Sequence, residues 1–376
     1  MKLKLLTILI FLFCSTQLTL GQCPPTYIYD GEAAGDWFGQ WVASAGDVNN
    51  DGFDDFVIGA QYNNAGEAKG GRVYVFSGLT GDTLYVFTGT VNNLIFGHSV
   101  ESAGDVNNDG YDDLIIGAPE TFSLNIDPGR AYVFSGKTGD TLYAFTGEAS
   151  GDRFGYNVAS AGDVNNDGFD DFIIGAIDNN SDRGRAYVFS GKTGDTLYVF
   201  SGEADFDGFG SPSGSAGDVN NDGYSDIIIG APGNDSGGIN AGRVYVFSGK
   251  TGDTLYVFTG EAQDDRFGLW ASTAGDVNND GFDDIIVGAF NNDAAGMDAG
   301  RAYVFSGQTG DTLYIFDGEA AGDQFGLLAN AAGDVNGDSF DDLIIGAYLN
   351  DAAGSDFWKG VCLFRKDRRH AYNFWR

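Results

Sequence analysis

One ten-residue segment, Gly-Asp-Val-Asn-Asn-Asp-Gly-Phe-Asp-Asp at 46–55, recurs nearly unchanged six times along this 376-residue chain. Counted between first aspartates, the copies are 58, 58, 55, 58 and 58 residues apart. A fixed period of this size is typical of repeat architectures, in which each unit buries its apolar surface against its neighbours. Length alone would allow two or three domains, but the even repeat favours one closed domain.

The third copy illustrates the pattern of one repeat. Short runs of β-branched, aromatic and small apolar residues alternate with acidic or glycine-rich turns, and no run has a helical period. The run after the acidic segment is apolar without alternation, which is typical of a strand covered on both faces. The repeat therefore predicts four short strands at 154–161, 172–176, 185–189 and 197–200, with an acidic loop at 162–171 and a turn at 190–195.

Such four-stranded units bury both faces when they stack radially, as in a β-propeller. The prediction is an all-β propeller of four-stranded blades, with six blades and seven as the alternative; a linear β-solenoid is less suitable because its repeats are usually shorter. Residues 26–32 match the fourth-strand pattern at 254–261, although no first three strands precede them. We expect this N-terminal strand to complete the last blade and close the ring.

The acidic loop has the composition of a metal-binding loop. Asp47, Asn49, Asp51 and Asp55 occupy loop positions 1, 3, 5 and 9, a glycine at position 6 allows a sharp turn, and the position-7 carbonyl can add a ligand. Oxygen ligands in a flexible loop suit Ca²⁺ better than Mg²⁺, and softer metals would ask for Cys or His. An EF-hand would need Glu at position 12, which here is Ile58.

The alternative is that Asn-Asp-Gly is simply a good turn, but six copies with every ligand position filled favour calcium, up to six ions, in a structural role. Ser339 replaces the glycine of the sixth loop, so we expect that site to be the weakest. The predicted ligands are Asp47, Asn49, Asp51, Phe53, Asp55; Asp105, Asn107, Asp109, Tyr111, Asp113; Asp163, Asn165, Asp167, Phe169, Asp171; Asp218, Asn220, Asp222, Tyr224, Asp226; Asp276, Asn278, Asp280, Phe282, Asp284; Asp334, Asn336, Asp338, Phe340 and Asp342.

Charge and the N-terminus indicate where the protein works. A formal charge of −34 argues against nucleic acid as a partner and against unassisted docking on anionic lipid. Two lysines, an apolar run at 5–14 and small residues before a break predict a signal peptide over 1–21. That run is too short to span a bilayer, and no later segment is apolar enough. We expect a secreted or cell-surface protein with no transmembrane segment in the mature chain.

Each copy joins a Phe-Gly pair, as at 38–39, to a Gly-Ala pair, as at 59–60, around the acidic loop, and two copies have the full Gly-Ala-Pro at 117–119 and 230–232. This pattern resembles the FG-GAP repeat of the integrin α-chain N-terminal propeller and its bacterial relatives. The resemblance covers residues 22–359 and implies a calcium-binding extracellular propeller used for adhesion or ligand recognition. Four copies depart from it by replacing the proline, with Gln61, Ile177, Phe290 and Tyr348.

Other motifs do not indicate an enzyme. The Ser-Gly-Lys-Thr-Gly segment at 135–139 imitates a P-loop, but a strand follows where a helix should begin, so we interpret it as a hairpin turn. No nucleophile motif accompanies His98, which we expect to line a channel or lie at the surface. Calcium loops already account for the carboxylate pairs that could perform acid–base chemistry.

The last residues, 360–376, depart from the repeat and are basic in an otherwise acidic chain. Codons can be chosen for 360–371 that, read from the second base, encode Ala-Tyr-Val-Phe-Ser-Gly-Lys-Thr-Gly-Asp-Thr, the third strand and turn expected there. The hypothesis is a frameshift near residue 360; a basic interaction peptide is the alternative. If the frameshift is real, Cys362 has no functional role and a disulfide between Cys23 and Cys362 is not expected. Any C-terminal anchor or sorting domain would also be missing from this chain.

The ligand surface is expected on the loops after Gly-Ala, which vary most between copies. Trp41, Tyr156 and Trp270 follow Phe-Gly and could stack on sugar rings, although such aromatics more often pack between blades. The predicted partner is an extracellular protein or glycan, and the predicted role is a non-enzymatic adhesion or ligand-binding module. A purely structural repeat of a larger assembly and a glycan-active enzyme are the alternatives.

Overall fold

The computed structural model describes residues 27–121, 126–179, 183–350 and 361–364. The predicted signal peptide, Cys23 and most of the aberrant tail lie outside these ranges. Within them, no helix is long and apolar enough to cross a membrane.

The described secondary structure consists of six antiparallel sheets in which sequential strands are neighbours, which confirms the all-β prediction. Five sheets have four strands and the last has three. Sheets 1 to 3 contain β1 (Phe38–Gly46), β2 (Asp55–Ala60), β3 (Arg72–Phe76) and β4 (Thr83–Thr88); β5 (Ser99–Gly104), β6 (Asp113–Ala118), β7 (Arg130–Phe134) and β8 (Thr141–Thr146); β9 (Phe154–Gly162), β10 (Asp171–Ala176), β11 (Arg185–Phe189) and β12 (Thr196–Ser201). Sheets 4 to 6 contain β13 (Ser213–Gly217), β14 (Asp226–Ala231), β15 (Arg243–Phe247) and β16 (Thr254–Thr259); β17 (Trp270–Gly275), β18 (Asp284–Ala289), β19 (Arg301–Phe305) and β20 (Thr312–Asp317); β21 (Phe325–Gly333), β22 (Asp342–Ala347) and β23 (Val361–Phe364).

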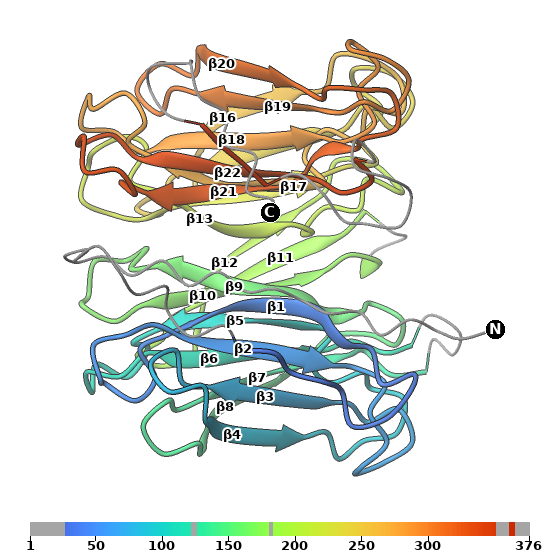
Figure 1. Ribbon diagram of the computed structural model, residues 1–376, viewed down its shortest axis with the longest axis vertical. Coiled ribbons are helices and arrows are strands. Elements are labelled where there is room, and N and C mark those ends of the chain that lie inside the picture. Colours follow the sequence, from blue (N-terminus) through green and yellow to red (C-terminus); the bar gives the residue numbers. More distant parts are fainter. Residues whose placement is uncertain (1–26, 122–125, 180–182, 351–360, 365–376) are drawn as a thin grey trace.

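The sheets pack face to face in chain order. Every residue of β2, β6, β10, β14 and β18 is buried. Neighbouring sheets cover both faces of β6, β10, β14 and β18, whereas β2 packs against sheet 2 on one face and lies in a cluster with Tyr29 of the N-terminal segment on the other. One apolar cluster joins Val57 and Val75 of sheet 1 to Leu114 and Ile116 of sheet 2, and similar clusters join each later pair of sheets. First strands lie toward the middle and the outer strands β4 and β20 lie at the edges (Figure 1), which is the arrangement of a β-propeller.

The N-terminal segment 27–32 contacts sheet 1, although it forms no strand in the described structure. Tyr29 stacks on Phe76 with ring centroids 4.1 Å apart, as Phe87 of β4 stacks on Phe134 of sheet 2 at 4.3 Å. Glu32 forms an ion pair with Arg72 at 2.8 Å. The segment therefore makes with sheet 1 the contacts that a fourth strand makes with the sheet after it.

The sixth sheet takes its third strand from the beginning of the tail. β23 pairs antiparallel with β22, and Phe364 lies opposite Leu343 just as Phe305 lies opposite Ile285 in sheet 5. Residues 361–364 thus take the third-strand position with the sequence as it stands, although the repeat pattern is lost there. The remainder of the tail, and the frameshift hypothesis with it, lies outside the described residues.

Candidate calcium loops

The six acidic segments connect the first and second strands of their sheets. We number them loop 1 to loop 6, at 47–55, 105–113, 163–171, 218–226, 276–284 and 334–342. The position-9 aspartate begins the second strand rather than ending the loop, and pairs with the glycine that ends the first strand, as in Gly46↔Asp55. All six loops therefore occupy equivalent positions in the sheets.

The position-1 aspartate organises each loop. In loop 1 the two carboxylate oxygens of Asp47 accept hydrogen bonds from the backbone N–H groups of Asp51 at 3.0 Å and Gly52 at 2.8 Å. Asn50 and Gly52 have φ values of 55° and 86°, in the left-handed region that Asn and Gly tolerate best. The backbone therefore curls around this carboxylate, and the position-5 and position-9 side chains are brought close to it.

The position-9 aspartate is the buried member of the set. In loop 2 Asp113 is fully buried and accepts hydrogen bonds from Asn107 Nδ2 at 2.9 Å and from the backbone N–H of Gly136 at 3.0 Å. Burial is the main cause that raises the pKa of Asp113 to about 7; the hydrogen bond from Gly136 opposes the rise, and the charges of Asp105 and Asp109 add to it. The same causes raise the pKa of Asp55 to about 6 and of Asp171, Asp226 and Asp284 to about 7.

Buried oxygens at ligand positions fit a cation. Asp109 Oδ1 at position 5, and Asn165 Oδ1 and Asn278 Oδ1 at position 3, are buried with no hydrogen-bond partner in the described structure. An acceptor of this kind is costly unless something donates to it or binds it. A hard cation would satisfy these oxygens. The described side chains nevertheless contain no ready-made group of three or more His, Cys, Asp or Glu side chains arranged around one point.

The aspartate at position 8, which is not among the predicted calcium ligands, connects neighbouring loops. Asp112, at position 8 of loop 2, accepts a 2.8 Å hydrogen bond from the backbone N–H of Asp47 in loop 1. Asp170, Asp283 and Asp341 repeat the contact with the loops before them. In loop 4 this position is Ser225. An aspartate occurs at position 8 in five of the six copies, although the turn itself does not require two consecutive aspartates. This recurrence is the signal in the sequence that position 8 has a role of its own.

The Ser-Gly turns brace the loops and form hairpins, as predicted. In sheet 2 the turn connects β7 and β8, and Tyr85 of sheet 1 donates a 2.6 Å hydrogen bond to the carbonyl of Gly136. A Cβ atom on Gly136 would lie 1.9 Å from the carbonyl oxygen of Asp112, so no larger residue fits between turn and loop.

Loop 6 differs from the others in its backbone. Ser339 has a φ of 69°, where the preceding loops have glycine at position 6. A side chain in the left-handed region is strained unless it is Asn, Asp or Gly. Gly337 stands at position 4, where the other loops have Asn. This supports the expectation that loop 6 is the least favourable site.

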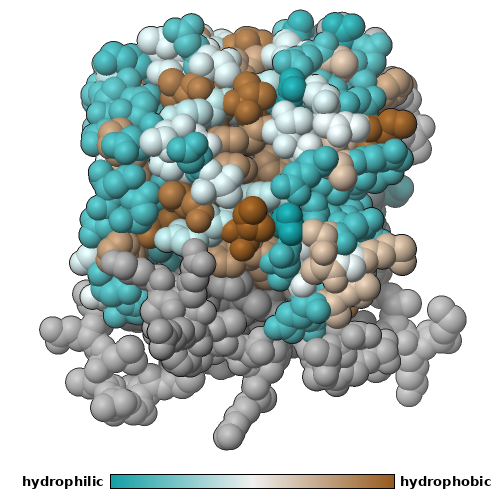
Figure 2. All heavy atoms as spheres, turned by 90° about the horizontal axis from the view of Figure 1, so that it is seen from above, coloured by the Kyte–Doolittle hydropathy of each residue, from teal (hydrophilic) through white to brown (hydrophobic). Residues whose placement is uncertain are grey.

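The opposite end of the sheets carries the variable loops and an aromatic cluster. Trp41 and Trp270, from sheets 1 and 5, have ring centroids 6.5 Å apart, and His98 lies 4.7 Å from the ring of Tyr156. His98 also forms a hydrogen bond with Gln61 through Nδ1. Burial and the charge of Arg153 lower the pKa of His98 to about 4. First strands of three sheets and the residue before β5 thus bring these rings together. Figure 2 looks onto the side of the molecule that is uppermost in Figure 1, where hydrophobic residues gather in patches among hydrophilic ones.

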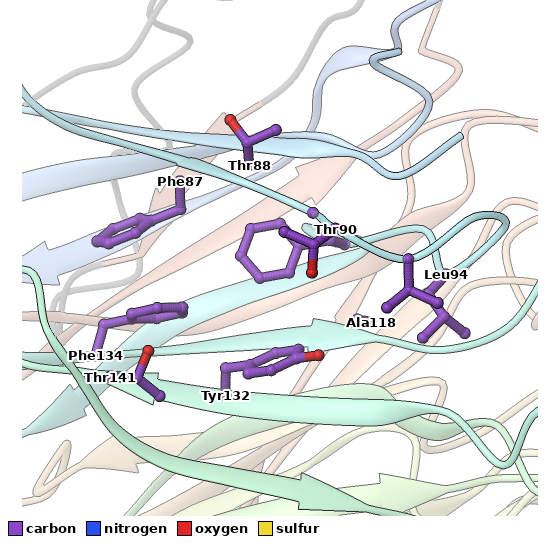
Figure 3. A pocket seen from close by; sticks show the side chains of 11 residues that line it. Phe87, Thr88, Thr90, Leu94, Ala118, Tyr132, Phe134 and Thr141 are labelled. Atoms are coloured by element: carbon purple, nitrogen blue, oxygen red, sulfur yellow. The ribbon is translucent and has the colours of Figure 1, made fainter. Parts of the chain in front are cut away.

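A pocket lies beside the second repeat, whose residues before the first strand differ from those of the other copies. Thr90, Leu94 and Thr121 replace the Glu, Asp and Asn of other copies. Elsewhere that aspartate, such as Asp152, accepts a 2.8 Å hydrogen bond from the asparagine, such as Asn179. The pocket, of about 210 Å³, lies between sheets 1 and 2 and is lined by rings that include Phe87, Phe134 and Tyr132 (Figure 3).

Comparison with known proteins agrees with the repeat. The model of the FG-GAP repeat matches residues 38–76, 96–134, 154–189, 212–247 and 267–305. Integrin alpha-5 of Xenopus laevis is 34% identical over 230 residues, covering 56% of this chain and 21% of that protein. Integrin alpha-V of Gallus gallus is 31% identical over 217 residues, covering 53% and 20%. The chain therefore spans about a fifth of the length of these relatives.

Among solved structures, the crystal structure of Saccharomyces cerevisiae Sqt1 is similar with a TM-score of 0.46 at 13% identity, over 77% of this chain and 66% of that one.

Proposed function

The chain belongs to the FG-GAP repeat family, and on that premise we propose that it is a secreted, calcium-stabilised propeller that acts as an extracellular adhesion or ligand-binding module. The observation that carries the calcium part is the set of buried oxygens without partners at ligand positions: Asp109, Asn165 and Asn278. In each loop the position-1, -3, -5 and -9 side chains and the position-7 carbonyl would hold the ion, and bound calcium would neutralise the carboxylates that crowd there.

The proposed ring has six blades over residues 22–359 and follows a signal peptide that ends at residue 21. Support for closure comes from Tyr29 and Glu32, which make with sheet 1 the contacts of a fourth strand. The N-terminal segment would then complete the sixth sheet. A variant beginning at Ala33 should unfold at a lower temperature than the chain beginning at Gln22. Equal transition temperatures would contradict this closure.

The proposed ligand surface lies at the end opposite the calcium loops. The variable loops are there, and so are the partly exposed rings of Trp41, Tyr156 and Trp270. Relatives named integrin alpha support an extracellular binding role rather than an enzymatic one. The partner would be a protein or a glycan, and stacking on a sugar ring is a role such aromatics can perform.

The test is binding of the chain from Gln22 onward to arrays of glycans and matrix proteins, in millimolar calcium and again with chelator. A ligand bound in calcium and lost on chelation supports the proposal. If folded, calcium-loaded protein binds nothing, the structural role in a larger assembly is favoured. Turnover of a glycan on the same arrays would instead favour an enzyme.

A further inference from the structure

The turn that follows the third strand places a lysine beside some loops and not others. Lys137, Lys192 and Lys250 stand in equivalent Ser-Gly-Lys-Thr-Gly turns of sheets 2, 3 and 4. Their Nζ atoms lie 4.0, 3.9 and 4.0 Å from a carboxylate oxygen of the position-5 aspartates Asp109, Asp167 and Asp222. The same contact thus recurs three times with nearly the same length.

The position-7 ring holds each lysine in place. The Nζ atoms lie 4.7, 4.6 and 4.7 Å from the ring centroids of Tyr111, Phe169 and Tyr224, within the range of a cation–π interaction. The side chains of the lysines remain 46 to 47% exposed, so this is a surface interaction of modest strength. Ring and carboxylate together nevertheless favour one position for the ammonium group, directly beside a predicted calcium ligand.

Loops 1 and 5 have no such charge. The equivalent turn residues are Leu79 and Gln308, and no described cation forms an ion pair with Asp51 or Asp280. The equivalent turn of sheet 6 lies outside the described residues. The chain therefore offers a natural comparison, with the same ligand residues in loops 1, 2, 3 and 5 apart from the position-7 side chain, and with a lysine beside only some of them.

Lysine and a metal ion would share the position-5 carboxylate rather than exclude one another. Asp109 Oδ2 faces Lys137, whereas Asp109 Oδ1 is buried and has no hydrogen-bond partner among the described residues. Oδ1 is thus left for a cation while the ammonium group partly neutralises the same carboxylate. A positive charge this close to a divalent ion opposes its binding, and because the lysines are exposed the opposition is strongest at low ionic strength.

We propose that Lys137, Lys192 and Lys250 are built-in counter-charges that divide loops 1 to 5 into two calcium-affinity classes, with loops 1 and 5 tight and loops 2, 3 and 4 weak. This inference rests on the proposed calcium binding. In the absence of calcium the lysines neutralise part of the carboxylate charge in loops 2 to 4. The protein then responds to calcium over a wider concentration range than six identical sites would.

The test is a calcium titration of the full chain by equilibrium dialysis and calorimetry at low ionic strength. We expect two ions to bind in the tight class, and Asp47→Ala and Asp276→Ala each to remove one of them. Asp105→Ala should remove an ion from the weak class only. The triple variant Lys137→Gln, Lys192→Gln, Lys250→Gln should tighten the weak class by about threefold to tenfold.

Two variants complete the design. Leu79→Lys introduces the missing charge beside loop 1 and should move one tight site into the weak class. Lys69→Gln removes a lysine that contacts Tyr62 at the other end of the sheets and should change neither class. Circular dichroism on each variant confirms that it is folded.

The outcomes separate the two claims. Saturable calcium binding that is lost loop by loop in the aspartate variants, but is unchanged in the triple lysine variant, would overturn this inference and leave the proposed function standing. Loss of a tight ion in Asp105→Ala would also overturn it. A wild-type chain that is folded yet binds no calcium would overturn both.

Discussion

The two ends of the sheets follow different rules. At the end with the acidic loops, the same hydrogen bonds recur in copy after copy, such as Gly136 N–H to Asp113 and Gly249 N–H to Asp226, each at 3.0 Å. At the other end the loops differ in length and sequence, and a buried Asp–Asn hydrogen bond is the feature that most copies share there. The difference teaches that one end serves as scaffold and the other is free to vary.

The largest expected effect comes from a substitution at the end with the acidic loops, which we call the scaffold end. Asp113→Ala removes a buried carboxylate and leaves the N–H of Gly136 without its acceptor. We expect the free energy of unfolding in calcium to fall by about 3 kcal/mol, because a lost buried ionic acceptor costs more than a neutral one. Denaturant unfolding in calcium and in chelator measures it. A loss below about 1 kcal/mol in calcium would contradict the role given to position 9.

A smaller effect is expected at the variable end. Asp152→Ala removes hydrogen bonds from Ala149 N–H and Asn179 Nδ2, both at 2.8 Å. We expect a loss of about 2 kcal/mol that is the same with and without calcium, since no predicted ligand is involved. The same unfolding experiment measures it. If this loss depended strongly on calcium, the two ends would be energetically coupled, which would contradict the distinction drawn between them.

A gain in stability is expected in loop 6. Ser339→Gly removes the strain of a side chain at a φ of 69° and should stabilise the protein by about 1 kcal/mol. The matched reverse change is Gly281→Ser in loop 5, where Gly281 has a φ of 87°. It should destabilise by a similar amount. Thermal unfolding of both variants measures the pair, and a destabilising Ser339→Gly would refute the account of this loop.

The last expected effect, which appears only in acid, concerns His98 at the variable end. The pKa of His98 in the folded state is about 4, below the ordinary value of 6.5, so the unfolded chain binds more protons between these pH values. The contribution of His98 is therefore present above about pH 6.5 and is lost as the pH falls toward 4. Nuclear magnetic resonance titration of the imidazole, assigned with His98→Gln, checks it. Protonation near pH 6.5 would contradict its burial against Gln61 and the neighbouring rings.

The sequence alone predicts most of the fold because the repeat aligns strands and turns in every copy. The strands of sheet 3 all lie within a residue of their predicted bounds; Asp171, for example, begins β10 instead of ending the loop. The position-8 aspartates were missed because a link between loops of different sheets depends on how the sheets stack. The contact of Lys137 with Asp109 could not be predicted either, since nothing in the local sequence indicates that the Ser-Gly-Lys-Thr-Gly turn lies beside the acidic loop of the same sheet.

The central claim is that calcium holds the scaffold end together. Thermal unfolding of the chain from Gln22 onward in 1 mM calcium and in excess chelator, with the bound calcium counted by equilibrium dialysis, tests it most directly. Several sites filled well above their dissociation constants stabilise a protein by about 2 to 3 kcal/mol each at a hundredfold excess. The account predicts up to six bound ions and a transition temperature that falls clearly in chelator. No bound calcium, with the same transition temperature in both conditions, would contradict it.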